Sequence, residues 1–299
     1  MKTICFLTIK GGTGKTTSVL TVGTMMAKAG KKVLLVDLDP QQNLSSMYVD
    51  DDVNNVDDFC AIYNGEYKDN GKTMDALLLD KKYDTKEYIH NTKIENLDII
   101  PSTAYLAQVE VILKTSFDDV QQWILKNRLA QVQDEYDYCL LDCGPSLGIL
   151  NANALGAANE VYIPTRTDGG SFTGVALMLS TIREQTYNPT LKVGGCFITE
   201  YVRQTNNAKD TYMDYMEAFA RCGLEDMLLP LVIRQSSIVP NLSQKRELLI
   251  EADPSMRNNV TKDYAVLTKL IMSEDKKGFI EENKLHNKMN KLLGFEENA

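Results

Sequence analysis

The chain lacks the features that mark several large classes of protein. Its 299 residues contain no run of eighteen apolar residues and no secretion signal at the start, so neither membrane spanning nor export is indicated. Its six cysteines include no C-x-x-C pair, and we expect reduced thiols, with Cys5, Cys139 and Cys196 in core strands. No repeat or Pro/Gly/Ser-rich linker divides the chain. A composition of 43% hydrophobic and 24% charged residues therefore predicts a cytoplasmic globular protein with one large domain.

The chain also has no excess of basic residues, since its formal net charge is -9. Residues 50–70 hold seven acids and one lysine and alone contribute -6, so the remaining chain is only mildly acidic. The whole-chain charge argues against a generally basic nucleic-acid-binding surface. A local basic face is still compatible with it, and binding to DNA is not excluded.

Short apolar runs alternate with longer segments of helical period along the chain. This is the pattern of strand–helix units that build a parallel sheet covered on both faces. The expected strands are residues 3–9, 32–37, 97–101, 136–142, 160–164, 191–199 and 227–233. The expected helices are residues 16–29, 103–133 with a break near Ser116, 147–158, 172–185 and 207–222. The predicted fold class is α/β, with a mostly parallel twisted sheet and helices on both of its faces.

Two regions are predicted as additions to this core, which spans residues 1–272. Residues 50–96 are acidic and weakly periodic, and they predict an excursion that carries short helices. Residues 273–299 predict a charged tail with a short amphipathic helix. The apolar stripe of that helix consists of Leu285, Met289, Leu292 and Leu293. This stripe can dock on the body of the protein, or it can bind a partner or a membrane surface.

Residues 10–17, KGGTGKTT, directly follow the first expected strand and open the first expected helix. We call them the phosphate loop, because glycines without a Cβ let backbone N–H groups turn around a phosphate and a helix N-terminus adds its positive end. Lys15 can reach the β- and γ-phosphate oxygens, the Thr16 hydroxyl can bind Mg²⁺, and Thr17 can contact the α-phosphate. The predicted cofactor-binding residues of the loop are Lys10, Gly11, Gly12, Thr13, Gly14, Lys15, Thr16 and Thr17. Ile9 stands where the common pattern has glycine, so a search for that pattern would miss this loop.

Three acids come at the ends of expected strands. Asp37 and Asp39 lie at the carboxyl end of the second strand, beside the loop, where ligands of open α/β sheets bind, and alternation puts them on the same side. Such a pair can hold the hydration shell of Mg²⁺ and orient a water for attack on the γ-phosphate. Asp142 ends the fourth expected strand. This is the position expected for a carboxylate that contacts Mg²⁺ directly or through water. There are structural alternatives to these roles. Asp37 and Asp39 can cap the following helix, and Asp142 can belong to a plain turn at the end of its strand.

With these motifs the chain resembles the ParA/MinD family of deviant Walker A ATPases, and most closely its ParA/Soj partition branch. The phosphate loop, residues 36–43 (VDLDPQQN) and residues 142–147 (DCGPSL) carry the resemblance. Residues 97–102 (LDIIPS) are a fourth segment, similar to the partition branch in particular. The likeness covers residues 1–270, and it implies a P-loop NTPase fold with ATP and Mg²⁺ as cofactors.

The resemblance also implies roles for single residues. Lys10 is similar to a signature lysine that crosses a nucleotide-sandwich dimer interface to the partner subunit's phosphates. Lys15 would be the γ-phosphate ligand, and Asp39 would position the hydrolytic water, which makes Lys10, Lys15 and Asp39 the implied catalytic residues. Thr16, Asp39 and Asp142 would hold the metal, while Asp37 would lie beside the nucleotide.

The function that the resemblance implies is ATP hydrolysis with weak basal activity, coupled to partition of a plasmid, a chromosome or a mobile element. ATP would favour a homodimer, the dimer would bind DNA without sequence specificity, and a ParB-like centromere-binding partner would stimulate hydrolysis. The protein would then be cytoplasmic and nucleoid-associated, with membrane binding not expected. The candidate DNA contacts are Arg203, Arg234, Lys245 and Arg246, for each of which a solvated surface position is the alternative.

Two other functions fit parts of the sequence. A MinD-like membrane-positioning ATPase would use the C-terminal apolar stripe together with Lys284, Lys288 and Lys291, although the acidic residues nearby weaken this interpretation. An iron–sulfur reductase resembling the nitrogenase iron protein needs two cluster-bridging cysteines in each chain. Cys143 is suitably placed for one of them, but residues 61–138 contain no second cysteine.

Overall fold

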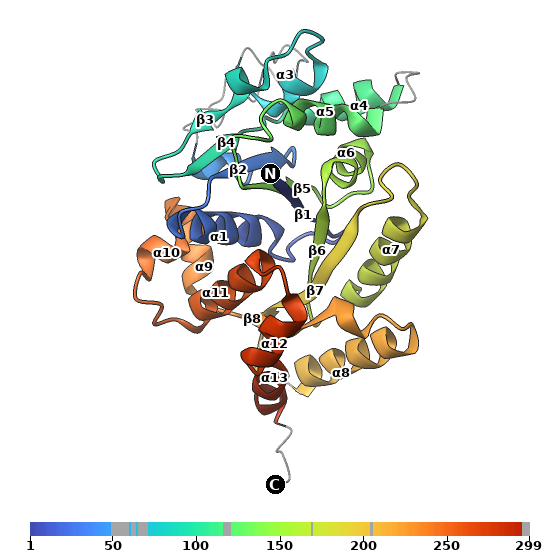
Figure 1. Ribbon diagram of the computed structural model, residues 1–299, viewed down its shortest axis with the longest axis vertical. Coiled ribbons are helices and arrows are strands. Elements are labelled where there is room, and N and C mark those ends of the chain that lie inside the picture. Colours follow the sequence, from blue (N-terminus) through green and yellow to red (C-terminus); the bar gives the residue numbers. More distant parts are fainter. Residues whose placement is uncertain are drawn as a thin grey trace.

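The computed structural model describes residues 1–48, 71–115, 121–168, 170–203 and 206–294, together with Cys60 and Asn64. Within these residues eight strands form one twisted sheet with the order β3-β4-β2-β5-β1-β6-β7-β8 (Figure 1). Seven strands run parallel, and only the short β3 pairs antiparallel, with β4. The strands are β1 (Lys2–Phe6), β2 (Val33–Leu38), β3 (His90–Asn91), β4 (Leu97–Ile100), β5 (Tyr138–Cys143), β6 (Glu160–Thr165), β7 (Lys192–Tyr201) and β8 (Leu228–Arg234).

Strand residues alternate between two apolar cores, one on each face of the sheet. In β1, Ile4 and Phe6 belong to one core and Cys5 belongs to the other, as a period of two requires. The first core is closed by α1 (Lys15–Lys28), α9 (Ile238–Lys245), α10 (Leu249–Ala252) and α11 (Asn259–Met272). The second is closed by α3 (Met74–Leu79), α4 (Leu106–Thr115), α5 (Ile124–Ala130), α6 (Ile149–Ala157), α7 (Ser171–Glu184) and α8 (Asn206–Arg221).

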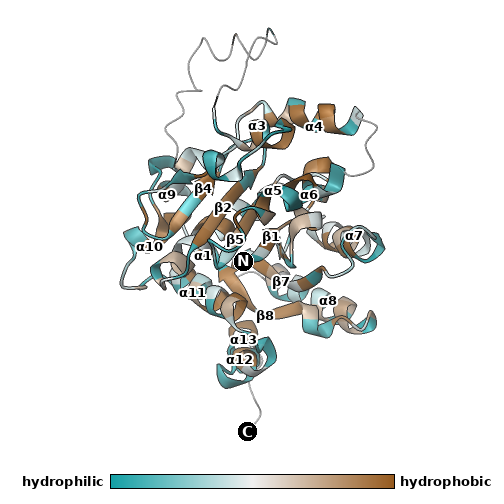
Figure 2. Cartoon of the chain, turned by 45° about the horizontal axis from the view of Figure 1, so that its top comes forward, coloured by the Kyte–Doolittle hydropathy of each residue, from teal (hydrophilic) through white to brown (hydrophobic). Residues whose placement is uncertain are grey.

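The predicted α/β fold class is confirmed, because the strands are buried on both faces and helices cover each face. Figure 2 shows the apolar colour concentrated on the strands and the polar colour on the outer sides of the helices. Each of the seven predicted strands has a counterpart whose ends differ from the prediction by at most a few residues. Cys5, Cys139, Cys143 and Cys196 are buried and free, as expected for reduced core thiols.

Three details of the fold add to the sequence prediction. The segment expected to be a broken helix over residues 103–133 is two helices, α4 and α5, and the expected position of the break near Ser116 lies outside the described residues. The excursion of residues 50–96 contributes α3 and the edge strand β3, and most of its acidic first part also lies outside the described residues. The second strand does not adjoin the first, because β5 pairs with both and lies between them.

The C-terminal helix α13 (Leu285–Leu293) lies beside β8, and α12 (Lys276–Glu282) lies between α11 and α13 in the chain and contacts both (Figure 1). Three residues of the predicted apolar stripe, Leu285, Met289 and Leu293, are only 3–4% exposed. Met289 and Leu293 belong to the second apolar core. The stripe therefore packs on the protein's own body. No helix in the described part of the chain is both long and apolar enough to span a membrane.

The approach of α6 to the turn before α5 leaves no room for a side chain at Gly156. A Cβ built there would lie 2.2 Å from the carbonyl oxygen of Gln122, which is backbone and cannot move alone. We predict that Gly156→Ala lowers the free energy of unfolding by about 1–3 kcal/mol through overpacking. Gly174→Ala in α7 is the matched control, since no atom lies within 4 Å of its Cβ position. It should raise stability by up to about 1 kcal/mol. Urea unfolding measures both, and equal effects would contradict the packing argument.

Candidate active site

The phosphate loop joins β1 to α1 and takes the shape of an anion cradle. Gly12 and Gly14 have φ angles of +70° and +76°, in the left-handed region that glycine adopts without strain. The helix begins at Lys15 with no acidic residue in its first turn, so its positive end is not offset by the chain. The Thr199 hydroxyl donates to the carbonyl oxygen of Thr13 at 2.9 Å, or to that of Thr165 at 3.0 Å. This contact ties the loop to the ends of β6 and β7.

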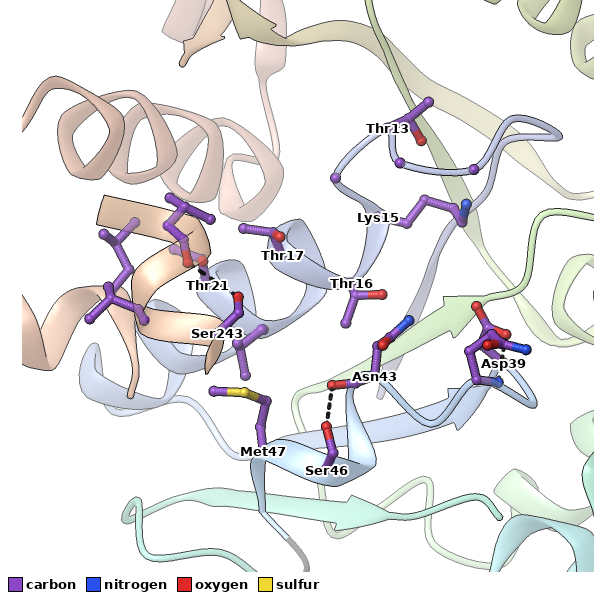
Figure 3. Close-up of a pocket in the computed structure, with 18 of the residues that line it drawn as sticks. Thr13, Lys15, Thr16, Thr17, Thr21, Asp39, Asn43, Ser46, Met47 and Ser243 are labelled. Atoms are coloured by element: carbon purple, nitrogen blue, oxygen red, sulfur yellow. Dashed lines mark hydrogen bonds between the residues drawn. The ribbon is translucent and has the colours of Figure 1, made fainter. Parts of the chain in front are cut away.

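A cavity of about 480 Å³ opens over the loop (Figure 3), a volume within the range of small-ligand sites. Gly11 to Thr17 form its floor, and Asp39 and Asn43 form the wall toward β2. The opposite wall comes from α9, α10 and the first turns of α1. Its apolar members are Leu20, Val239, Leu242 and Leu249. The cavity thus has a polar end at the loop and an apolar end beside α9.

Lys15 points from the start of α1 toward the strand ends (Figure 3). Its side chain is almost fully buried, and its Nζ donates to the carbonyl oxygen of Lys10 at 3.3 Å. Burial lowers the pKa of Lys15, while the nearby Asp142, Cys143 and Asp39 act in the opposite direction. A buried ammonium with so few partners is suited to a polyphosphate, which would supply the missing oxygens.

Asp142 lies at the end of β5, opposite Phe6 of β1 and Asp37 of β2 in the parallel register. It is fully buried, and neither carboxylate oxygen has a partner in good hydrogen-bond geometry, although the Thr16 side chain lies close enough to act against the rise in its pKa. Burial and the charge of Asp37 raise its pKa well above the ordinary carboxyl value. Unpartnered buried carboxylate oxygens are rare in native proteins and need an explanation, and a hydrated divalent cation provides one.

The donor set fits Mg²⁺ bound mainly through a nucleotide. Among the residues that the structure describes, no three His, Cys, Asp or Glu side chains converge on a common metal position. Mg²⁺ usually keeps several waters and takes one or two carboxylates plus phosphate oxygens. Thr16 and Asp39 line the cavity, and Asp142 lies behind them, so these three predicted residues would hold the ion or its water shell.

Asp37 and Asp39 differ in role, although sequence alternation predicts a similar placement. The oxygens of Asp37 accept hydrogen bonds from the backbone N–H of Asp39 at 3.0 Å, from that of Ser45 at 2.9 Å and from the Ser45 hydroxyl at 2.7 Å. Burial raises the pKa of Asp37 to about 6. Asp37 therefore shapes the turn after β2, while Asp39 lines the cavity with one oxygen bound by the N–H of Gln41 at 3.0 Å.

Ser102, after β4, supports the same turn and was not predicted as a site residue. Its N–H donates to the Ser45 hydroxyl at 2.8 Å, and its own hydroxyl donates to the carbonyl oxygen of Asp39 at 3.1 Å. Both serines are buried. The sequence signal was the resemblance of residues 97–102 to the partition branch, which identifies a similar segment but not the contact that it makes.

Four charged residues form a cluster at the outer side of the phosphate loop, which we call the outer charge cluster: Lys10, Arg166, Asp168 and Glu200. Lys10 and Arg166 both pair with Asp168, and Arg166 also pairs with Glu200. Partial burial acts to raise the pKa of Asp168, but hydrogen bonds from Lys10 and Ser171 hold it below its ordinary value. Sequence reasoning predicted only Lys10. Glu200 has a φ of 51°, unusual for a residue with a side chain and invisible in the sequence.

Of the four candidate DNA contacts, Arg203 follows β7, Arg234 is the last residue of β8, and Lys245 and Arg246 lie at the C-terminal end of α9. Arg203, Lys245 and Arg246 are exposed. Arg234 is instead held by Asp263 of α11, which accepts from its Nε at 2.8 Å and its Nη2 at 2.5 Å. Its guanidinium is therefore already engaged within the chain.

Comparison with known proteins identifies the family. A family model described as an AAA domain matches residues 1–193. The chromosome-partitioning ATPase Soj of Treponema pallidum (strain Nichols) is 38% identical over 211 residues, which are 70% of this chain and 75% of that protein. The chain belongs to the ParA/MinD family of P-loop ATPases. The virulence plasmid ParA family protein pGP5-D of Chlamydia psittaci is 34% identical over 277 residues, 91% of this family member and 94% of the relative.

The fold of this ParA/MinD-family chain is also found among solved structures. Cobyrinic acid a,c-diamide synthase from Mycobacterium smegmatis, solved with bound ADP and magnesium, superposes with a TM-score of 0.71. The match covers 93% of this chain and 96% of that one at 24% identity, so it shows a common fold and nothing more.

The Cys143 thiol does not face the surface, because its side chain is fully buried in β5 beside Cys5. A bridging cluster between two chains needs cysteines at a surface that both chains share. The position of Cys143 is therefore that of a core residue, as in the other buried cysteines of this family member.

The unpartnered Asp142 generates a stability prediction. Asp142→Asn removes a buried charge and should raise the free energy of unfolding at pH 8, without ligands, by on the order of 2 kcal/mol. The raised pKa of Asp142 means that ionisation costs the folded state stability from about pH 4 upward. The gain should therefore shrink as the pH falls toward 4, where the wild-type carboxyl is neutral.

Urea unfolding between pH 4 and pH 8 measures this difference, with Asp226→Asn as the control. Asp226 is an exposed aspartate that pairs with Lys277 on the surface, so its replacement should change stability little at any pH. A loss of stability in Asp142→Asn at pH 8 would contradict the argument from unpartnered burial.

Proposed function

We propose that this protein is a Mg²⁺-dependent partition ATPase. It binds ATP in the cavity over the phosphate loop, forms an ATP-dependent homodimer and binds DNA without sequence specificity. It drives partition of a plasmid, a chromosome or a mobile element, and a ParB-like partner stimulates its weak basal hydrolysis. The observation that carries the proposal is the convergence of the phosphate loop, Lys15, Asp39 and the unpartnered Asp142 at one edge of the sheet. The similarity to Soj and to a plasmid ParA family protein supports the biological role.

The cavity fits ATP in one orientation. The polyphosphate lies over the N–H groups of Gly12 to Thr17, with Lys15 at the β- and γ-phosphates. The base lies at the apolar end, against Leu242 and Leu249. Asp39, held by Gln41 and Ser102, is fixed where it can orient a water for in-line attack. A bound Mg²⁺ would neutralise phosphate charge near Thr16 and Asp142, which supplies the electrostatic part of the chemistry.

The proposed dimer explains why Lys10 lies outside the cavity. Among the described residues, the cavity wall includes Gly11 and Lys15 but not Lys10, whose ammonium contacts Asp168 instead. A lysine on the outer side of the loop is placed to serve the nucleotide of a second chain. Each complete site would then take its cations from two subunits.

The proposed DNA contacts are Arg203 after β7 and Lys245 and Arg246 at the C-terminal end of α9. All three are exposed, and phosphate contacts of this kind need only accessible cations. Arg234 contributes less under this proposal, since Asp263 already pairs with its guanidinium.

The MinD-like alternative needs an apolar helix face that is free to enter a membrane. In α13 that face is buried against the body of the protein, with Leu285, Met289 and Leu293 almost inaccessible. Lys276 of α12 further anchors this segment, donating to Glu160 of β6 at 2.7 Å. The structure therefore gives this alternative no support, and we favour DNA as the surface that the dimer binds.

The nucleotide site is tested by two substitutions with opposite outcomes. Lys15→Ala should abolish productive nucleotide binding, because it removes the buried ammonium that faces the phosphates. Asp39→Ala should bind ATP and dimerise but lose turnover by about 100-fold or more, since it removes the group that orients the water. Phosphate release and light scattering with ATP or ADP measure these properties. Full hydrolysis by Asp39→Ala would refute the role given to that carboxylate.

The DNA surface is tested by retention on nonspecific duplex DNA in the Asp39→Ala background, which traps ATP. Retention should occur with ATP only and weaken as salt rises. Lys245→Gln and Arg203→Gln should each lower the salt slope by about 1. Arg221→Gln, at an exposed arginine of α8 paired with Glu217, is the matched control and should change nothing. No retention in any nucleotide state would overturn the DNA proposal, and liposome binding would be measured next.

A further inference from the structure

We propose that Arg166 is a second cation that acts on the nucleotide of the partner subunit, beside Lys10. In the single chain, Asp168 and Glu200 would hold both cations at the outer side of the phosphate loop until a second chain arrives. The inference rests on the proposed ATP-dependent dimer and extends it by a residue that the sequence motifs do not include.

The contacts of Arg166 place its guanidinium directly on the loop. Its Nη1 donates to the carbonyl oxygen of Gly12 at 3.2 Å and lies 2.9 Å from Glu200 Oε2. Its Nε lies 3.3 Å from Asp168 Oδ2, while Lys10 contacts the other oxygen of the same carboxylate. Lys10 and Arg166 therefore share one acid, and whatever draws Lys10 away from Asp168 also changes the surroundings of Arg166.

Arg166 and Lys10 lie on the same side of the loop, since both contact Asp168. In the described part of the chain, the cavity wall includes Gly12 and Glu200 but neither of the two cations. A Cβ built on Gly12 would lie 4.0 Å from Arg166 Nη1, so the guanidinium packs against the loop at Gly12. A phosphate presented by a second chain at this face would meet both cations together.

The acids that hold Arg166 can release it at little cost. The side chains of Arg166, Asp168 and Glu200 are 34%, 41% and 42% exposed, and ion pairs so accessible to water contribute little to stability. A guanidinium fork binds phosphate oxygens bidentately, a stronger contact than these single-point pairs. The charges of the two cations and the two acids also cancel. The outer charge cluster of the single chain therefore carries no net charge that would attract other charged molecules.

Glu200 supplies a second, independent sign that this arrangement is specified. Its φ of 51° is in the left-handed region, where a residue with a side chain is seldom found and where strain collects at functional sites. This conformation, immediately after Thr199 of the loop-supporting contact, accompanies a carboxylate that faces Arg166 at the cavity rim.

The first test separates binding of a chain's own nucleotide from action on the partner's. In Arg166→Gln, affinity for a fluorescent ATP analogue at low, monomeric protein concentration should stay within about twofold of wild type. ATP-dependent dimerisation and turnover should fall by about tenfold or more, since a charge-stabilising donor is lost. Arg166→Lys keeps the positive charge but lacks the guanidinium fork. Its dimerisation and turnover should fall between those of wild type and those of Arg166→Gln. Arg221→Gln is the control for loss of an exposed guanidinium.

The second test mixes two variants that each have low turnover. In a mixed dimer of Asp39→Ala and Arg166→Gln, one site has Asp39 from its own chain and Arg166 from the partner. At a protein concentration high enough to drive dimerisation, an equimolar mixture should regain at most about a quarter of wild-type turnover, because at most half of the dimers are mixed and each mixed dimer has one complete site. No recovery in the mixture, although mixed dimers form, would show that Arg166 acts within its own chain and would overturn the inference.

Failure of the inference is distinguishable from failure of the proposed function. Wild-type protein that stays monomeric with ATP would overturn the proposed dimer itself. Wild-type protein that dimerises, together with Arg166→Gln that dimerises and hydrolyses equally well, would overturn only the role of Arg166. Equal loss of analogue binding and of turnover in Arg166→Gln would assign the residue to supporting its own loop, which also overturns the inference.

Discussion

The parallel pairing of β1, β5 and β2 is the constraint on which the rest of the site depends. Parallel strands bring their carboxyl ends to one edge, so the phosphate loop after β1, Asp142 at the end of β5 and the turn after β2 meet there. The pairing is itself stabilised by two apolar cores, one on each face, because every central strand is buried on both sides. The chemistry of the site is therefore a consequence of the sheet register, and a slip of one residue in β5 would turn Asp142 to the wrong face.

This geometry concentrates charge where water is excluded. Asp142 and Asp37 have raised pKa values and Lys15 a lowered one, and burial is the largest cause in each case. Asp37 offsets the cost with three hydrogen bonds from the turn that it organises, whereas Asp142 has only the nearby Thr16 side chain and no hydrogen bond of good geometry. Asp37 is thus a buried acid that stabilises a turn, whereas Asp142 is a buried acid whose oxygens are available to a ligand. A site of this kind gains stability when its ligand binds, which couples nucleotide binding to the rigidity of the surrounding turns.

The phosphate loop has two working sides in this interpretation. Its inner side, with Lys15 and the start of α1, faces the cavity and the chain's own nucleotide. Its outer side carries the outer charge cluster, in which two cations are neutralised by two acids at the surface. The inner charges are buried, while the outer ones are partly exposed to water. This difference in burial is what would allow the same loop to bind tightly within one chain and reversibly between two.

The sequence by itself determined the fold class and most of the inner site, because local patterns carry that information. Strand and helix periods, the glycines of the phosphate loop, and Asp39 and Asp142 at strand ends are all readable along the chain. Only the tertiary structure decided that β5 separates β1 from β2, that Asp37 supports a turn with Ser45 and Ser102, and that Arg234 pairs with Asp263. The tertiary structure alone also decided that Arg166, Asp168 and Glu200 gather around Lys10, and that α13 docks on the body of the protein. Each joins residues far apart in the chain, and such contacts depend on strand order and backbone conformation, which no local pattern encodes.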